Sequence, residues 1–297
     1  MDSTAAIENK VIRVVENIRN LPTPPIVFHQ IQKVISDPNS SAAQVAAVLA
    51  EDPAMSVKVL KLTNSAFYGL AREIESVRQA VTIIGMEAVK NLVLSASVLD
   101  MFKGKQVDEE FQEAFWRHSL ATAFCCRLMA RQVKTRGMVD PDTAFSSGLL
   151  HDIGKLIVSC FLPQEWHNFK EARERDPNSP DWVVEEAVWG FTHAQVGGVL
   201  ASVWKLPQKL SDAITFHHMP QLSEGEGPVA YIAHLANEVA HKTFEDPAAT
   251  AGPTSNLQDG VLEYMKLDHE NLLSISEQLR EEYLKAETFM AMVGLSA

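Results

Sequence analysis

Cysteine is scarce in this chain. Its 297 residues include three cysteines, Cys125, Cys126 and Cys160. An odd number, with two of them adjacent, excludes a framework of paired disulfides and lacks the CxxC spacing of a thiolate metal site. Such cysteine usage is typical of a reducing compartment, so we expect a cytoplasmic protein.

Basic residues and long apolar runs are also few. The 26 lysines and arginines face 38 aspartates and glutamates, which gives a formal net charge of −12. This excess of negative charge argues against nucleic acid and anionic membranes as partners. No apolar run reaches the roughly 18 residues that a membrane helix needs. The first residues are too polar for a signal peptide, so we expect no membrane insertion. The sequence also has no phosphate loop, GxSxG or dinucleotide fingerprint.

Signals for β-strands are absent, whereas helical periodicity runs through almost every segment. No Asn-Gly or Asp-Gly turn lies between two alternating runs. Helix caps are recognisable, because Asp52 precedes Pro53 and Ser76 precedes a run that Gly85 can end. The sequence therefore predicts an all-α fold. We divide it into a helical N-terminal lobe (1–105), a second helical domain (106–245), and a linker with a C-terminal helix (246–297).

Five histidines and one aspartate fall on or beside faces that should point inward. They are His118, His151, Asp152, His193, His217 and His218. His151 and Asp152 are adjacent within the apolar run LLHDIGKLIVSC, which we expect to be one helix. A buried aspartate needs a specific partner or a cation. Neutral imidazoles with a carboxylate are suitable ligands for Fe, Mn or Zn, and glycines such as Gly148 would let helices approach closely around them. The alternative is that each histidine is a hydrogen-bonded core residue.

The same motifs resemble a known superfamily. LLHDIGKL, the upstream His118, THAQVGG and the pair His217-His218 resemble the HD phosphohydrolase superfamily. In the first half, LPTPPIVFHQIQKVI, LAEDPAMSVKVLKLTNSAFYG and VRQAVTIIGMEAVKNLVL resemble the HDOD (HD-related output domain) family of bacterial signalling proteins. The resemblance covers about residues 20–240 and implies an HD-like helical bundle packed against a helical N-terminal lobe.

The resemblance also implies a role in signalling, with protein partners, and most family members are not catalytic. This chain keeps the histidines and the aspartate of the related HD-GYP phosphodiesterases, which cleave cyclic di-GMP and often use iron. It departs from those enzymes at Met219, where they have glutamate, and at Asn237, where the superfamily has its last aspartate ligand. Lys155 resembles a lysine that contacts phosphate, although it could equally be a solvated surface residue.

Three hypotheses about function follow. The first is a signal-transduction output or scaffold module, non-catalytic or weakly active, with a partly retained His/Asp site for a transition metal (Fe, Mn or Zn, iron before zinc). Its partners would be proteins, with a nucleotide or phosphate as a second kind of ligand. The alternative is a metal-dependent phosphohydrolase acting on a cyclic dinucleotide or nucleotide. A third is a switch that senses a metal or oxygen.

Overall fold

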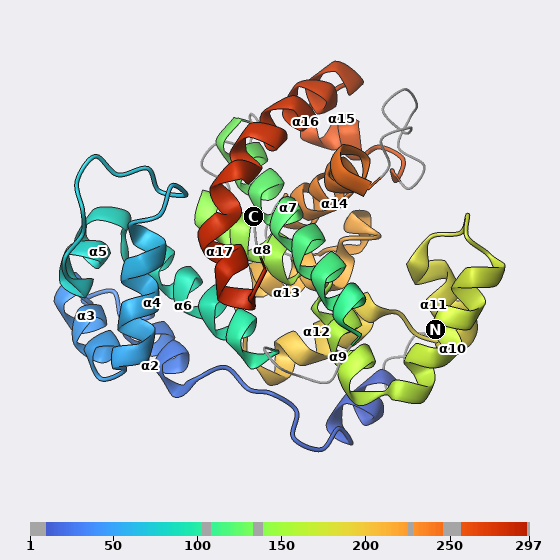
Figure 1. The fold of residues 1–297 in the computed structure, drawn as a ribbon, viewed down its shortest axis with the longest axis horizontal. Helices are drawn as coiled ribbons and strands as arrows, with labels where there is room; N and C mark the ends of the chain where they lie inside the picture. Colours follow the sequence, from blue (N-terminus) through green and yellow to red (C-terminus); the bar gives the residue numbers. More distant parts are fainter. Residues whose placement is uncertain (1–9, 103–107, 133–138, 225–227, 246–256, 296–297) are drawn as a thin grey trace. The chain divides into compact units, whose positions relative to one another are not determined.

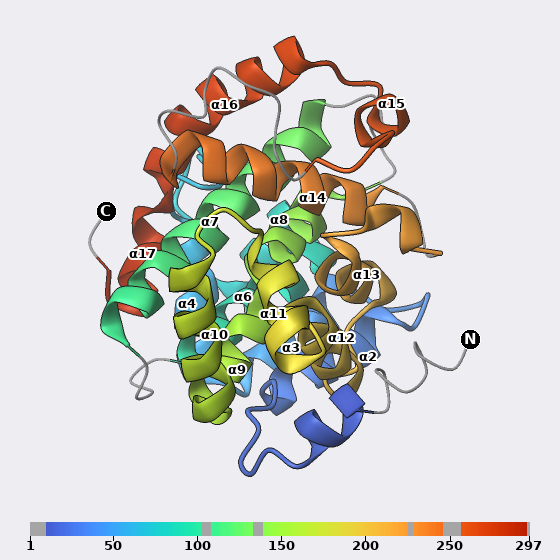
Figure 2. The ribbon, with the colours of Figure 1, turned by 90° about the vertical axis from the view of Figure 1, so that its right-hand side faces the viewer.

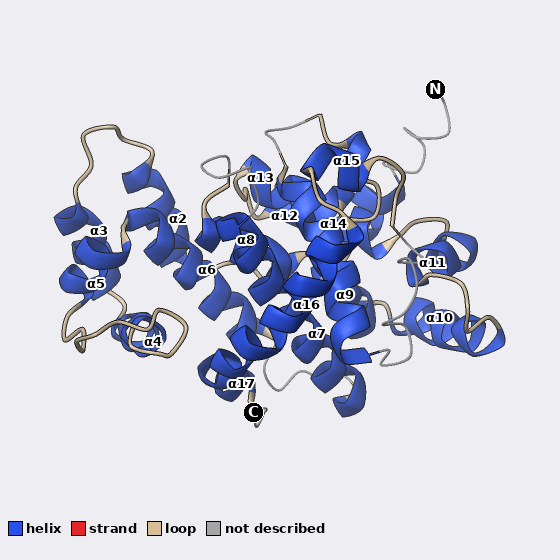
Figure 3. Ribbon diagram, turned by 90° about the horizontal axis from the view of Figure 1, so that it is seen from above, coloured by secondary structure: helices blue, strands red, loops and turns tan. Residues whose placement is uncertain are grey.

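The chain is helical throughout the part that the structure describes. The computed structural model describes residues 10–102, 108–132, 139–224, 228–245 and 257–295, and these contain helices, turns and loops but no strand (Figures 1 and 3). The predicted all-α class is thereby confirmed. The linker predicted at 246–256 and the boundary predicted near residue 105 lie outside the described residues.

The contacts divide the chain into two compact units. One comprises Met1–Leu21 and Lys105–Ser276, and the other comprises Pro22–Gly104 and Glu277–Ala297. Both units thus combine segments from distant parts of the sequence. The sequence predicts a different division, into residues 1–105, 106–245 and 246–297, and this division stays a prediction.

The unit around Pro22–Gly104 contains short helices joined by tight turns. Its helices are α2 (Ile26–Ile35), α3 (Ala42–Ala50), α4 (Pro53–Thr63), α5 (Val77–Ile84), α6 (Met86–Met101), the 3-10 turn η4 (Leu284–Ala286) and α17 (Glu287–Val293). The predicted caps form, because Asp52 accepts a hydrogen bond from the Met55 amide and Ser76 accepts one from the Gln79 amide. Each cap satisfies an amide that the first helical turn leaves without a partner.

The unit around Lys105–Ser276 carries all the predicted site residues. Its helical turns at 10–16 are followed by α7 (Glu109–Gln132), α8 (Pro141–Leu150), α9 (Ile153–Phe161), α10 (Pro163–Arg175), α11 (Asp181–Trp189), α12 (His193–Val203), α13 (Gln208–Phe216), η1 (Pro220–Leu222), α14 (Val229–Ala240), the π-helical turn η2 (His241–Glu245) and α15 (Val261–Met265). Helix α16 (His269–Tyr283) begins in this unit.

Helices α7, α8, α13 and α14 form the centre of this unit (Figure 2). Helix α8 packs against α7, α13 and α14. The approach of α8 to α7 depends on Gly148, since a Cβ atom there would lie 2.7 Å from the Ala123 Cα atom. This close packing brings His118 on α7 near the end of α8. The sequence predicted that Gly148 would allow such a close approach of helices around the histidines.

No single helix among the described residues is both long enough and apolar enough to cross a membrane, although two bent helix pairs meet the criteria of length and composition together.

Candidate metal centre

His151 and Asp152 lie in a turn between two helices. Helix α8 ends at Leu150 and α9 begins at Ile153, so the expectation of one continuous helix was wrong. The His151 Nδ1 atom lies 2.7 Å from the Gly148 carbonyl oxygen, to which it donates. Asp152 occupies the N-cap position of α9, yet its side chain caps no amide. The break in the helix therefore leaves this carboxylate available to groups outside its own helix.

His193 and His217 are fixed by equally specific contacts. Thr192 and Gln195 form a capping box, which makes His193 the first residue of α12. Glu185 Oε2 accepts from both the His193 backbone amide, at 2.8 Å, and the Nδ1 atom, at 2.6 Å. His217 follows the last residue of α13, and its Nδ1 atom donates to the Ile214 carbonyl oxygen at 3.0 Å.

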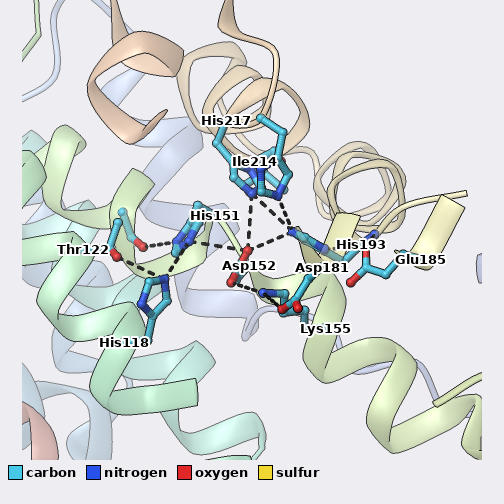
Figure 4. Close-up of polar contacts among 12 residues, drawn as sticks. His118, Thr122, His151, Asp152, Lys155, Asp181, Glu185, His193, Ile214 and His217 are labelled. Carbon is cyan, nitrogen blue, oxygen red and sulfur yellow. Dashed lines mark hydrogen bonds and ion pairs between the residues drawn. The ribbon is translucent and has the colours of Figure 1, made fainter. Parts of the chain in front are cut away.

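These side chains meet around one oxygen of Asp152 (Figure 4). The distances from Asp152 Oδ1 to the Nε2 atoms are 2.9 Å for His193, 3.3 Å for His217 and 3.4 Å for His151. Oδ1 is buried, and its shortest contact among these is with the His193 Nε2 atom at 2.9 Å. It is therefore a buried, charged oxygen surrounded by imidazole nitrogens.

Each of the remaining two histidines lies beside another histidine of the cluster. The His118 Nε2 atom lies 3.4 Å from the His151 Nε2 atom, and the His218 Nε2 atom lies 3.0 Å from the His193 Nε2 atom. All six residues singled out in the sequence thus lie together, although they span a hundred positions. We call these six residues, His118, His151, Asp152, His193, His217 and His218, the His/Asp cluster.

Five residues of the cluster are buried and the sixth, His218, is half-buried, and most of the histidines are neutral. His151, His193 and His217 have no exposed surface, Asp152 is 2% exposed and His118 is 8% exposed. Burial lowers the pKa of His151, of His217 and of His218, since a buried imidazolium loses its hydration. Burial alone would raise the pKa of Asp152, but the neighbouring imidazoles and Lys155 hold it well below its usual range.

His193 differs from the other histidines because it lies between two carboxylates. Burial alone would lower its pKa, but Glu185 and Asp152 outweigh this and raise the pKa of His193 to about 9. A metal ion that binds the Nε2 atom must therefore displace a proton.

The spacing of the cluster is suitable for a metal ion. With bonds of about 2.1 Å, two ligand atoms of one ion lie about 3.0 Å apart in an octahedron and about 3.4 Å apart in a tetrahedron. The separations of 2.9–3.4 Å around Asp152 Oδ1 fall in this range. Because the Nδ1 atoms of His151 and His217 donate to carbonyl oxygens, the Nε2 atoms keep their lone pairs, and both Nε2 atoms lie within 3.4 Å of Asp152 Oδ1. Such carbonyl contacts are typical of metal-ligating histidines.

The ligand atoms form two groups that share Asp152. One consists of His118, His151 and Asp152, and the other consists of Asp152, His193, His217 and His218. In each group the ligand atoms lie within 4.8 Å of one another. The donor set contains imidazoles and a carboxylate but no thiolate, which is compatible with Fe, Mn or Zn.

Lys155 is held within the unit by two carboxylates. Its Nζ atom lies 2.9 Å from Asp152 Oδ2 and 3.2 Å from Asp181 Oδ2. Asp181 Oδ1 in turn accepts from Arg173 Nε at 2.9 Å. Lys155 is therefore largely buried and already paired, which differs from a solvated surface lysine. Its contact with phosphate stays a prediction.

One face of α14 covers the cluster. His234 Nδ1 donates to the His217 carbonyl oxygen at 2.7 Å, and the His241 ring lies 4.2 Å from the His118 ring, centroid to centroid. Asn237 stands between these two residues, three positions after His234 and four before His241, so it shares their face. Its Oδ1 atom is buried and has no hydrogen-bond partner among the described residues. This placement is compatible with the ligand position predicted for Asn237.

Met219 lies beside the cluster in sequence but not among the ligand groups. It is half-buried and occupies the N-cap position of η1, two residues after His217.

Sequence reasoning missed Glu185 and the role of His234. Glu185 has no exposed surface and holds His193 through two hydrogen bonds. Helical periodicity offers one signal, because Glu185 follows Val184 and lies three residues before Val188, on the apolar side of α11. His234, which the sequence analysis does not single out, holds the backbone of His217 through the hydrogen bond from its Nδ1 atom.

The comparisons with known proteins identify the family. The HDOD domain model matches residues 21–220, so this chain belongs to the HDOD domain family. Among curated proteins, an uncharacterized protein of Treponema pallidum (strain Nichols) is 23% identical over 275 residues, which cover 92% of this chain and 52% of the relative. The chain thus spans about half the length of that relative.

Two solved structures show the same fold. A Shewanella amazonensis SB2B protein named "Putative phosphohydrolase" has a TM-score of 0.73 and 24% identity, with 97% of this chain and 98% of that chain covered. An HDOD domain protein of unknown function from Geobacter sulfurreducens has a TM-score of 0.70 and 22% identity, with 98% and 97% covered. At these identities the likeness concerns the fold.

Proposed function

We propose that this chain is a bacterial, cytoplasmic signal-transduction module with a closed metal centre and little or no hydrolytic activity. The observation that carries the proposal is the arrangement around Asp152 Oδ1, where three buried imidazole nitrogens lie at 2.9–3.4 Å. A cation at this point would compensate the charge of the buried oxygen and would bind the Nε2 lone pairs of His151 and His217.

The low exposure of the ligands supports a structural or sensory role. A catalytic metal site keeps an open coordination position, whereas a structural site is closed by protein ligands. Here His118, His151, Asp152, His193 and His217 are between 0% and 8% exposed, and His218 is half-buried. A bound ion would hold α8, α12 and α13 together, because its ligands come from the ends of these helices. Protein partners could then respond to the metal-dependent rigidity of this unit.

The charge around Asp152 argues in the same direction. Its Oδ2 atom is paired with the Lys155 ammonium at 2.9 Å, so part of its negative charge is already compensated. Asn237 contributes no charge, and Met219 contributes neither charge nor an oxygen ligand. Two ions at one site need bridging carboxylates to offset their charge, so a single ion is favoured.

A metal-dependent phosphohydrolase is the second candidate. The observation that favours it is the division of the cluster into two ligand groups that share Asp152. An ion held there would supply Lewis-acid polarisation of a phosphate oxygen or of water. Asp152 and the histidines would hold and orient it, and Lys155 would balance charge beside it. In this reading the substrate class is a cyclic dinucleotide or a nucleotide.

The experiment that separates these functions measures metal and activity on the same samples. The full chain is purified after growth with added iron and manganese, and its metal content is determined by mass spectrometry. Hydrolysis is then measured on cyclic dinucleotides and nucleotides with Mn²⁺ or Fe²⁺ added. We expect close to one ion per chain and no efficient turnover.

A pair of variants provides the control. Asp152→Ala removes the shared ligand and should remove the ion while most of the helix content remains. His269→Ala changes an exposed histidine and should leave the ion in place. Robust metal-dependent cleavage by the unmodified protein, abolished in Asp152→Ala, would establish the hydrolase instead. A protein that purifies without metal would make the cluster a polar core.

A further inference from the structure

A cavity lies away from the His/Asp cluster but within the same compact unit. It has a volume of about 900 Å³ and lies between the helical turns at 10–16, the following turn and the junction of α9 with α10. Polar and charged groups in its lining are Lys10, Arg13, Asn17, Arg19 and Glu165. Its volume falls within the range of small-molecule sites, roughly 300–1,000 Å³.

The charge of the cavity is opposite to that of the chain. The lining of the cavity has a formal charge of +2, because it contains three cations (Lys10, Arg13 and Arg19) and one anion (Glu165). The whole chain has a formal net charge of −12. Arg13 and Arg19 are exposed, and neither forms an ion pair with another described residue. The two guanidinium groups are therefore available to an anionic ligand.

The side chain of Lys10, unlike those of the two arginines, forms a hydrogen bond to another part of the described structure. Its Nζ atom donates to the Trp189 carbonyl oxygen at 2.7 Å and lies 5.5 Å from the centroid of the Phe191 ring. The Trp189 Nε1 atom donates to the Glu165 carbonyl oxygen at 2.7 Å. These bonds tie the N-terminal turns to α10 and α11, so the wall of the cavity is fixed by contacts other than those of the arginines.

The apolar part of the lining indicates what the anion carries. Val14, Ile18, Phe161 and Leu162 line the cavity beside the arginines. Guanidinium groups match phosphate oxygens in pairs, and an aromatic ring such as Phe161 packs against a flat organic group. We propose that this cavity binds a small phosphate-bearing ligand of the nucleoside monophosphate class, with Arg13 and Arg19 on the phosphate and the organic part against Ile18 and Phe161.

This ligand site is separate from the cluster. Helix α9 begins directly after Asp152 and ends at Phe161, which lines the cavity. Nine residues of helix at a rise of about 1.5 Å per residue separate the two positions by about 13 Å. Binding at the cavity is therefore independent of the function proposed for the cluster and does not require a metal ion.

The test measures binding of adenosine and guanosine monophosphates to the full chain by calorimetry, with adenosine and inorganic phosphate for comparison. We expect a nucleoside monophosphate to bind at least tenfold more tightly than either comparison ligand. Arg13→Gln and Arg19→Gln should each weaken binding about tenfold or more, since each removes a charge-assisted contact. Arg78→Gln, at an exposed arginine of the other unit, should leave the affinity unchanged.

Cys160 locates the ligand independently. It lines the cavity and is half-buried, whereas Cys125 and Cys126 are buried and serve as internal references. Bound nucleotide should slow alkylation of Cys160 by iodoacetamide, detected by mass spectrometry. The proposal is wrong if neither nucleotide binds at millimolar concentration, if the arginine variants bind unchanged, or if inorganic phosphate binds as tightly as the nucleotides.

Discussion

Replacing Gly154 with alanine should disturb both the stability of the unit around Lys105–Ser276 and its metal site. A Cβ atom on Gly154 would lie 1.9 Å from the His193 carbonyl oxygen, 2.8 Å from its carbonyl carbon and 3.0 Å from the Gly197 nitrogen. Ordinary contact begins at 3.4 Å, so α9 and α12 must separate by about 3.4 − 1.9 = 1.5 Å. All three clashing atoms belong to backbone, so no side-chain rotation can relieve the contact.

The same displacement separates Asp152 from His193. Metal sites tolerate changes in ligand distance of only about 0.2 Å, so a shift of this size should cost most of the metal affinity. Overpacking of this kind typically destabilises a protein by about 1–3 kcal/mol. For a unit of this size, a loss of about 2 kcal/mol corresponds to a fall in Tm of about 4–8 °C.

Thermal unfolding and metal content, measured on the same preparation, test this prediction. Ser202→Ala, at an exposed position on the same helix α12, is the matched control and should change neither quantity. If Gly154→Ala kept both the Tm and the bound metal of the unmodified protein, the close approach of α9 to α12 would have no role in forming the site.

Three further changes give distinct outcomes. Glu185→Gln removes the carboxylate that holds His193 Nδ1 and should lower metal affinity about 10–100-fold with little loss of helix. Glu186→Gln, at the exposed neighbouring position, should leave metal affinity unchanged. Titration with a metal chelator measures both affinities. Asn237→Asp, alone or with Met219→Glu, should raise metal occupancy more than it raises the rate of hydrolysis. A large gain in turnover without a gain in bound metal would contradict the conclusion that missing negative charge limits metal binding. Asn168→Asp, at an exposed position, is the control. Asp52→Ala removes the N-cap of α4 and should cost about 1 kcal/mol in urea unfolding, while Glu51→Ala, which caps no amide of that helix, should cost less.

Features that depend on neighbours in sequence were predictable. The caps at Asp52 and Ser76 each join residues three positions apart, so local spacing was sufficient to recognise them. Helical periodicity likewise predicted which face His118 shares with the core of α7. Burial of a carboxylate next to a histidine was enough to predict that Asp152 has partners from elsewhere in the chain.

Features that depend on tertiary contact were not predictable in the same way. The turn at His151-Asp152 interrupts a run that has full helical periodicity, and there the Asp152 carboxylate contacts His193 on α12. The contact of Glu185 with His193 joins the middle of α11 to the start of α12 through a turn whose path the sequence does not reveal. The contact of α14 with the cluster depends on how α13 and α14 pack, which no local pattern encodes.

The most direct test of a closed His/Asp metal centre is X-ray absorption spectroscopy of the protein purified from iron- and manganese-supplemented cells. The structure predicts an ion with at least three imidazole nitrogens and a carboxylate oxygen in its first coordination shell, and no sulfur. The signal should be lost in Asp152→Ala and kept in His269→Ala. A shell of water oxygens alone, a sulfur ligand, or an unchanged spectrum in Asp152→Ala would contradict the account.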